Sequence, residues 1–362
     1  MNNKKYRVAL VGFYQIKGAF SGASEVSQSL YDSLIFKKKL FDLKNPKNLE
    51  NNFIIKLFNP YVIKPIKILY QLKKVVNYLK KSKNKLLIIE GASWIGYSYL
   101  FIKLSKFFLK DLKIFYHGHN VEYEIRKIKN SLLIQYLTKV LEKKVFENSD
   151  FPTVVSKNDQ NKIMKLYKKN SIIFNNGISK NRLECSAKKI EENFVIFSGN
   201  YFFLPNKIAI NKLLKIFEKL IRFEKNLKLV LTGSEIPSNI KKKNYIIFKK
   251  NLNKKDLNNY LKKSICTILP MQNAPGTKLK VIEGLLNGVT IIGSQPSFKG
   301  INLKKINPPF IYKNDKDLLR IALNVVKNKK KYKSFSKKNI NFYKKNYLME
   351  NILNNFTKNE LY

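Results

Sequence analysis

The first residues whose types and spacing could do chemistry lie in a short apolar segment, residues 276–288, GTKLKVIEGLLNG. The N–H groups at a helix start have no partner within the helix and attract anions, and nearby lysines add positive charge. One carboxylate about two turns further along, Glu283, can accept hydrogen bonds from two adjacent hydroxyls, such as those of a ribose. The pattern predicts a nucleoside diphosphate site whose anion-binding end consists of Gly276, Thr277, Lys278 and Lys280. The alternative is an ordinary amphipathic helix with Glu283 on its exposed face.

A second candidate is the loop at residues 116–124, YHGHNVEYE, which contains both histidines of the chain. The loop follows an expected strand, and ligands of α/β proteins bind at the carboxyl ends of parallel strands. A metal site would need further histidine, cysteine or carboxylate ligands at fixed spacing, so no metal is expected here.

The elements that must position these residues alternate along the chain. Short apolar runs predict strands, and lysine-rich stretches between them predict helices. Expected strands cover residues 7–13, 52–58, 85–90, 113–117, 151–156, 171–176, 194–199, 227–233, 244–248, 265–270 and 289–294. Expected helices lie near residues 66–82, 94–110, 205–223, 254–263, 276–287 and 314–328, with another beginning near 22. This alternation is typical of parallel sheets covered by helices on both faces, so the fold class is α/β with two doubly wound domains.

The order of the motifs resembles that of GT-B glycosyltransferases, and most closely that of glycosyltransferase family 4. The segment PGTKLKVIEGLLNGVTIIGS (275–294) is similar to the donor site of that family. Other similar stretches, in the same order, are SGASEVSQSLYDSL (21–34), YHGHNVEYE (116–124), ENSDFPTVVSKND (147–159), IIFNNGI (172–178) and VIFSGNYFFLPNKIAINKLL (195–214).

This resemblance covers nearly the whole chain and implies two Rossmann-like domains that face a cleft. We expect an acceptor-binding domain at residues 1–176 and a nucleotide-sugar-binding domain at 177–330. A helical tail at 331–362 is expected to pack back toward the first domain.

The resemblance assigns donor-site roles to named residues. Glu283 matches the glutamate that holds the ribose hydroxyls, and the turn at 276–278 matches the backbone that binds the diphosphate. Lys278, with Lys280, is the candidate for neutralising the leaving phosphate. Donor-site positions in the second domain are also Gly199, Asn200 and Asn206, although the arginine and lysine common there in the family are missing. Pro275 stands where the family often has a sugar-contacting glutamate, so the sugar cannot be inferred.

In the first domain the resemblance makes His119 the active-site histidine near the transferred sugar. Gly18 and Gly22 lie in the loop that faces the cleft, although a plain turn would also use glycine. Glu122 is a weaker candidate for the acceptor side.

Asp315-Lys316-Asp317 has the D-x-D spacing of metal-dependent glycosyltransferases. Its position argues for helix capping instead, because acidic residues favour the first turn of a helix and Asn314 or Asp315 can cap it. Neither a metal nor a cofactor is therefore expected, and the nucleotide sugar is a substrate.

The formal net charge of +47 indicates possible partners. Arginine, which nucleic-acid readers favour, occurs at only five of the 71 basic positions, so no nucleic acid is expected. The lysine excess is explained either by biased coding or by attraction to an anionic membrane surface, with residues 63–81 and 100–113 as candidate amphipathic helices. Two cysteines and no long uncharged run indicate a cytoplasmic protein, at most peripheral to the membrane.

The resemblance implies a metal-independent, retaining glycosyltransferase that moves a sugar from a nucleotide-diphosphate donor to a glycan or polyprenyl-linked acceptor. This places it in cell-surface polysaccharide or glycoconjugate biosynthesis. Two alternatives remain open: a sugar-nucleotide epimerase with the GT-B fold, and a non-catalytic basic protein that binds membrane surfaces.

Overall fold

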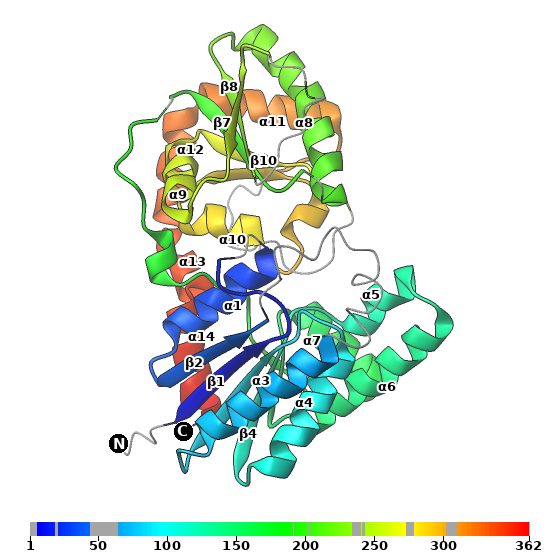
Figure 1. Cartoon of the computed structure of the whole chain (residues 1–362). Helices are drawn as coiled ribbons and strands as arrows, with labels where there is room; N and C mark the ends of the chain where they lie inside the picture. The colour runs from blue at the N-terminus through cyan, green and yellow to red at the C-terminus, as the bar shows by residue number, and fades with distance from the viewer. Residues whose placement is uncertain are drawn as a thin grey trace. The chain divides into compact units, whose positions relative to one another are not determined.

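The computed structural model describes residues 6–18, 21–43, 64–190, 192–201, 203–233, 240, 243–272, 279–301 and 310–361. It divides the chain into two compact units, one formed by Met1–Asn175 and Leu353–Tyr362 and the other by Asn176–Ile352. Within the described residues, each unit contains one six-stranded parallel sheet with helices packed on it (Figure 1). The predicted fold class, two doubly wound α/β domains, is confirmed.

The sheet of the first unit has the strand order β2-β1-β3-β4-β5-β6. Because β1 lies between β2 and β3, the order reverses there, and the ends of β1 and β3 form a topological switch point, where α/β proteins bind ligands. The strands are β1 (Arg7–Gly12), β2 (Lys37–Asp42), β3 (Lys85–Glu90), β4 (Leu112–Gly118), β5 (Phe151–Val154) and β6 (Ile172–Ile173).

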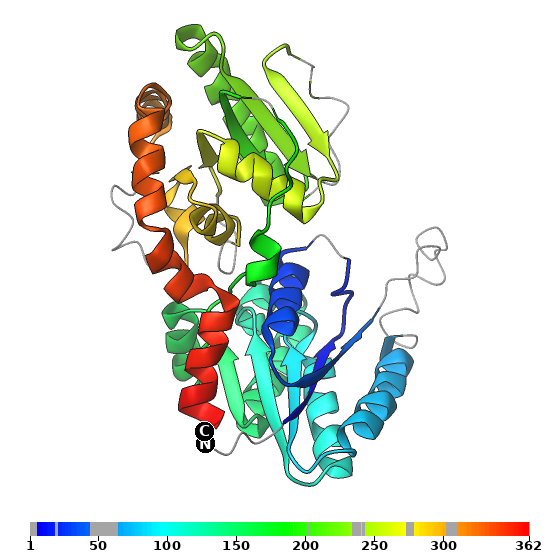
Figure 2. The ribbon, with the colours of Figure 1, turned by 90° about the vertical axis from the view of Figure 1, so that its left-hand side faces the viewer.

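The helices of this unit are α1 (Gly22–Ser33), α3 (Lys64–Leu79), α4 (Ile95–Phe108), α5 (Glu122–Lys129), α6 (Leu132–Asn148) and α7 (Lys157–Tyr167). Helix α4 packs against both α3 and α6, so these three helices form one layer. Alternation along β4 separates the two faces of the sheet. Tyr116 packs on Phe146 of α6, whereas Phe115 packs on Phe356, the last residue of α14 (Met349–Phe356). Figure 2 shows the end of α14, in red, on the opposite face of the sheet from α3.

The sheet of the second unit has the order β12-β11-β10-β7-β8-β9. Its switch point lies between β7 and β10, because the chain continues from β7 to β8 on one side and reaches β10 on the other. The strands are β7 (Phe194–Ser198), β8 (Lys228–Gly233), β9 (Ile246–Lys250), β10 (Cys266–Leu269), β11 (Thr290–Gly293) and β12 (Phe310–Ile311).

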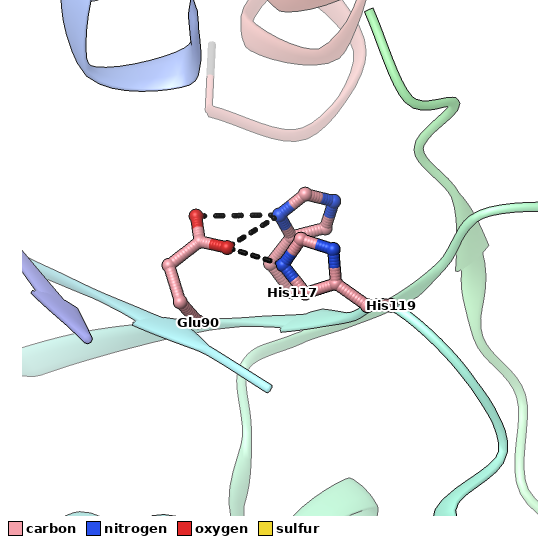
Figure 3. A group of neighbouring side chains, drawn as sticks. All are labelled: Glu90, His117 and His119. Atoms are coloured by element: carbon pink, nitrogen blue, oxygen red, sulfur yellow. Dashed lines mark hydrogen bonds and ion pairs between the residues drawn. The ribbon is translucent and has the colours of Figure 1, made fainter. Parts of the chain in front are cut away.

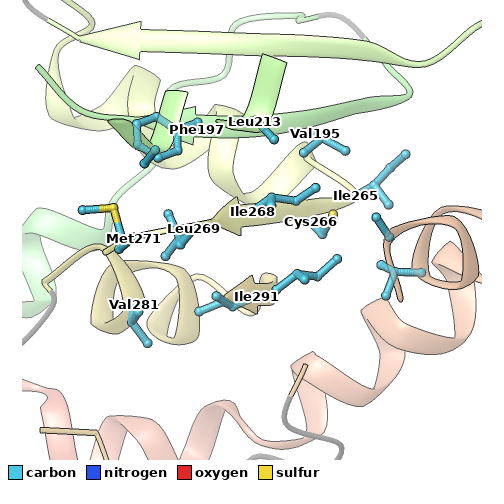
Figure 4. Close-up of a cluster of buried hydrophobic side chains, with 14 of the residues drawn as sticks. Val195, Phe197, Leu213, Ile265, Cys266, Ile268, Leu269, Met271, Val281 and Ile291 are labelled. Carbon is cyan, nitrogen blue, oxygen red and sulfur yellow. The ribbon is translucent and has the colours of Figure 1, made fainter. Parts of the chain in front are cut away.

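The helices of the second unit cover both faces of this sheet. They are α8 (Leu204–Phe223), α9 (Lys254–Lys263), α10 (Leu279–Leu286), α11 (Asp315–Lys327), α12 (Lys329–Lys338), α13 (Ile340–Tyr347) and the first half of α14, with short 3-10 turns at Lys180–Leu183 and Gln295–Phe298. Side chains of β7 alternate between two cores. Val195 and Phe197 join the large cluster drawn in Figure 4, and Phe194 and Ile196 pack with Tyr260 of α9.

Some expected elements differ from the structure. The expected strand at 52–58 lies outside the described residues. Strand β2 was not expected, because its sequence, KKKLFD, is dominated by lysine. It is an edge strand, and lysines on an edge strand hinder pairing with other chains. The tail, expected as one helical segment at 331–362, consists of α12, α13 and α14, followed by a short π-helix at Thr357–Leu361.

Candidate active site

Side chains from four segments of the first unit meet at its switch point. Glu90, the last residue of β3, is fully buried, as is His117 at the end of β4. Oε2 of Glu90 lies 2.5 Å from Nε2 of His119 and 3.1 Å from Nδ1 of His117 (Figure 3). The same oxygen accepts a hydrogen bond of 2.7 Å from the hydroxyl of Ser27.

Helix α1 can supply Ser27 because its buried face is lined with small polar residues. Ser24, Ser27 and Ser29 are buried there, and small side chains let the helix approach the strand ends closely. The hydroxyl of Ser27 also lies 2.7 Å from that of Tyr14, which follows β1. Four segments thus contribute to one hydrogen-bonded cluster, which we call the Glu90 cluster: Tyr14, Ser27, Glu90, His117 and His119.

The charges of the Glu90 cluster follow from these contacts. Burial raises the pKa of Glu90, but the charges and hydrogen bonds of His117 and His119 outweigh burial and hold that pKa well below its usual range. The pKa of His119 is lowered, mainly by burial and then by His117, with Glu90 opposing both. Burial and the charge of Glu90 raise the pKa of Tyr14. The cluster therefore combines an ionised carboxylate with a neutral His119.

Within the described part of the chain, one group of side chains could hold a metal ion. The ligand atoms of Glu90, His117 and His119 lie close enough together to do so. The sequence offered no third ligand for the histidine loop, and Glu90 supplies one from the neighbouring strand. The carboxylate of Glu90 already accepts hydrogen bonds from Ser27 and both imidazoles, so its own neighbours satisfy it, whereas Nε2 of His117 is buried and has no hydrogen-bond partner among the described residues.

A second group of predicted residues meets at the switch point of the second unit. Nζ of Lys280, in the first turn of α10, donates a 2.6 Å hydrogen bond to the side chain of Asn206 in α8. Asn206 in turn donates to the backbone carbonyl of Asn200, at 2.7 Å. Gly199 lies against both side chains, since a Cβ atom added to it would lie 2.8 Å from Nδ2 of Asn206 and even closer to Nζ of Lys280. The structure thus brings Gly199, Asn200, Asn206 and Lys280 together.

Glu283 lies one turn after Lys280, and residues three apart share a helix face. The alternative of an ordinary amphipathic helix with Glu283 on its exposed face is wrong, because the residue is only 8% exposed. Oε1 of Glu283 is 2.5 Å from Nζ of Lys254, the first residue of α9. No pattern in the sequence indicated Lys254, which is one lysine among many and lies 29 positions before Glu283. Glu90 was also missed, although a lone acid that ends the apolar run KLLIIE could have indicated it.

The remaining predicted residues take other positions. Gly276, Thr277 and Lys278 lie outside the described residues. Gly18 has a positive φ of 74° in an exposed loop, and Gly22 begins α1 with open space around it. Glu122 is buried at the start of α5 and forms an ion pair with Arg126. Among the described residues, it makes no hydrogen bond to the Glu90 cluster.

The D-x-D sequence forms a helix start, as predicted. The side chain of Asn314 accepts a hydrogen bond from the backbone N–H of Asp317 and so caps α11. Asp315 pairs with Lys212, and Asp317 with Arg320.

Residues 192–318 match the family described as "Glycosyl transferases group 1". This range contains Gly199, Asn200, Asn206, Lys280 and Glu283. No curated protein sequence matches the chain.

Solved structures are similar to the chain over nearly its full length. HepE from Anabaena in complex with UDP and glucose has a TM-score of 0.64 at 10% identity, covering 97% of this chain and 98% of HepE. A glycosyltransferase from Rickettsia africae has a TM-score of 0.55 at 14% identity, covering 98% and 100%. A putative UDP-N-acetylglucosamine 2-epimerase from Listeria monocytogenes has a TM-score of 0.54 at 11% identity, covering 92% and 91%. At these identities the likeness establishes the fold, GT-B.

Proposed function

We propose that the chain is a group 1 glycosyltransferase with the GT-B fold that transfers a sugar from a nucleotide-diphosphate donor to a glycan or polyprenyl-linked acceptor. The observation that carries this proposal is the contact of Lys280 with Gly199 at the switch point of the second unit, with Glu283 one turn further along α10. A cation, a carboxylate and a residue without a side chain lie where α/β folds bind nucleotides.

The geometry of α10 suits the two ends of a nucleoside diphosphate. Lys280 and Glu283 are separated by about 4.5 Å along the helix axis, at 1.5 Å per residue. Lys280 neutralises the diphosphate as the bond to the sugar breaks, and Glu283 accepts the ribose hydroxyls. Lys254 holds Oε1 of Glu283 and fixes the orientation of the carboxylate. Because Gly199 has no side chain, the ammonium group of Lys280 and the amide of Asn206 can lie directly against its backbone.

In the first unit, His119 borders the transferred sugar, and Gly18, Gly22 and Glu122 belong to the acceptor side. Transfer proceeds with retention at the anomeric carbon and without a metal, as the resemblance to family 4 implies. The complex of HepE with UDP and glucose supports UDP as the first nucleotide to test.

The donor site is tested by titrating the protein with UDP, GDP and ADP in a calorimeter. Glu283→Ala removes a charge-assisted acceptor worth about 1.5–3 kcal/mol, so affinity for the preferred nucleotide should fall roughly 10- to 100-fold. Glu218→Ala is the matched control, because Glu218 forms an exposed ion pair with Lys243 in the same unit. Unchanged affinity in Glu283→Ala would exclude the donor-site assignment.

The reaction is tested by screening nucleotide sugars for release of the nucleoside diphosphate, with polyprenyl-phosphate-linked acceptors present. A transferase releases the diphosphate only when the acceptor is present and forms a glycosylated lipid. An epimerase, the alternative favoured by the likeness to the Listeria protein, would convert one nucleotide sugar into another without an acceptor. Proton NMR of the sugar anomeric signals separates the two outcomes.

We propose that the protein is cytoplasmic and peripheral to the membrane. The outer surface of the layer formed by α3, α4 and α6 suits contact with a membrane that carries the acceptor. The amphipathic segments expected at 63–81 and 100–113 correspond to α3 and to the end of α4, although residues 112–113 already begin β4, and both helices pack on the core while exposing large apolar side chains. On this layer the most exposed are Ile66 and Tyr70 of α3, Phe107 of α4, and Leu132, Leu133 and Tyr136 of α6, each more than 60% exposed. Helices α3 and α4 contain lysines and no acidic residue. No helix within the described residues is long and apolar enough to cross a bilayer.

This surface is tested by flotation with vesicles of phosphatidylglycerol and phosphatidylcholine, and with phosphatidylcholine alone. The double variant Phe107→Ser/Phe108→Ser should lose most of the binding to anionic vesicles. Phe223→Ser, at an exposed site in the second unit, should keep it. Equal binding of all three proteins, or binding to duplex DNA in place of vesicles, would exclude the membrane surface.

A further inference from the structure

The Glu90 cluster connects His119 to residues that neither the sequence nor the family resemblance assigned. Its hydrogen bonds run from Tyr14 to Ser27 at 2.7 Å, from Ser27 to Glu90 at 2.7 Å, and from Glu90 to His119 at 2.5 Å. Ser27, Glu90 and His117 are each fully buried, so water does not compete for these contacts.

The directions of these hydrogen bonds follow from the charge of Glu90. An ionised carboxylate can only accept, so Ser27 must donate to it, and Nε2 of His119 and Nδ1 of His117 must each carry a hydrogen. Ser27 has one hydrogen to donate, so the phenol of Tyr14 donates to the Ser27 hydroxyl. The lowered pKa of Glu90 is consistent with its ionised form.

This pattern leaves only one tautomer for a neutral His119. Because Nε2 holds the hydrogen that points to Glu90, Nδ1 keeps its lone pair and can accept a hydrogen bond or a proton. Figure 3 shows that each imidazole directs one nitrogen toward Glu90 and the other away from it. Nε2 of His117 is buried, and no hydrogen-bond partner lies within its reach among the described residues. His119, which is 6% exposed, is therefore the histidine that can still contact a ligand.

We propose that Glu90 is a positioning residue for His119: it fixes the imidazole in the tautomer protonated on Nε2 and directs Nδ1 toward the ligand. Ser27 and Tyr14 hold Glu90 in place from α1 and from the segment after β1. The role of Nδ1 of His119 toward the acceptor or the sugar rests on the proposed function. The tautomer of His119 does not depend on that function.

The tautomer can be measured directly, because the chain contains only two histidines. We would label the full-length protein with ¹⁵N-histidine and record long-range ¹H–¹⁵N spectra, assigning the two rings with His119→Gln. The expected result is a protonated Nε2 and an unprotonated Nδ1 for His119. In Glu90→Gln the amide can donate as well as accept, so a substantial fraction of His119 should change to the other tautomer. Glu142→Gln, at another buried carboxyl of the same unit that hydrogen-bonds to neither histidine, should leave His119 unchanged.

Two results would overturn the proposal. One is a wild-type His119 protonated on Nδ1, a result that needs no variant to fold. The other is a Glu90→Gln protein whose His119 spectrum equals that of the wild type.

Kinetics then test the consequence for transfer. Glu90→Gln should lower kcat roughly 100-fold and leave the KM for the nucleotide sugar within about two-fold, because the donor site lies in the other unit. Ser27→Ala keeps the carboxylate and should lower kcat less than Glu90→Gln. Equal kcat in Glu90→Gln and the wild type would contradict a positioning role, whereas absence of any transferase activity in the wild type would contradict the proposed function alone.

Discussion

Glu142 offers a sharp test of how burial and hydrogen bonding compete in the first unit. Its side chain is fully buried and accepts hydrogen bonds from the backbone N–H groups of Glu122 and Tyr123, at 2.7 and 3.1 Å, and from the hydroxyl of Tyr167, at 2.6 Å. It therefore holds the start of α5. Burial raises the pKa of Glu142 from 4.5 to about 7, although these three hydrogen bonds oppose the rise.

The sign of the effect on stability follows from this shift. The folded protein binds the proton of Glu142 more tightly than the unfolded chain does, so protonation stabilises the fold. This stabilisation is fully present below pH 4.5 and is lost as the pH rises through 7. A difference of 7 − 4.5 = 2.5 pKa units corresponds to about 3 kcal/mol, of which roughly 2.5 kcal/mol is lost between pH 5 and pH 8.

Glu142→Gln removes the titration and keeps the shape of the side chain. The free energy of unfolding of this variant, relative to the wild type, should rise by roughly 2–3 kcal/mol from pH 5 to pH 8, whatever the constant offset between the two proteins. Urea unfolding followed by tryptophan fluorescence measures this directly, because the single tryptophan, Trp94, lies in the first unit.

A second variant checks the cause. Tyr167→Phe removes a hydrogen bond that lowers the pKa of Glu142, so the loss of stability should move to higher pH. A wild type that gains stability relative to Glu142→Gln as the pH rises would show that the hydrogen bonds outweigh burial, and the reasoning would be refuted.

The remaining predictions concern the second unit and the cysteines. Gly199→Ala places a methyl group against Lys280 and should weaken nucleotide binding by about 1.5–3 kcal/mol in calorimetry. The control is Gly22→Ala, in open space at the start of α1. This variant should bind the nucleotide as the wild type does and unfold at an equal or slightly higher temperature. Equal binding by Gly199→Ala and the wild type would place the phosphates elsewhere. Cys266 is fully buried and its thiol pKa is raised to about 12 by burial, so a thiol reagent should modify only the partly exposed Cys185 of the native protein. Labelling of one site per chain, abolished in Cys185→Ser, is the expected result, and modification of Cys266 before unfolding would contradict it.

Much of the architecture could be predicted from the sequence, because periodicity records which face of each element is buried. Apolar runs such as RVALVG and KLLIIE predicted β1 and β3, and the structure places both in the first sheet. Helices α5, α6 and α7 were not expected, and two strands with weak patterns were also missed. Strand β2 is a lysine-rich edge strand, and β12 contains two residues.

The candidate sites were predictable to a lesser degree. The histidine loop and Glu283 could be named from the sequence, because a strand end and a lone acid in an apolar helix are local patterns. The residues that form hydrogen bonds with them could not be predicted. Glu90 lies 29 positions before His119, and Ser27 lies 63 positions before Glu90.

The physical reason is the sheet order. By itself, the sequence determined most of the strands, several of the helices, and the histidine loop that follows β4. Only the tertiary structure decided that β1, β3 and β4 lie side by side, which brings Ser27, Glu90 and His119 within hydrogen-bonding distance. Parallel neighbours in a sheet are joined by long crossover connections, and no periodicity within a strand specifies its neighbour. The same limit applies to Glu283, whose buried pairing with Lys254 depends on how α9 and α10 pack.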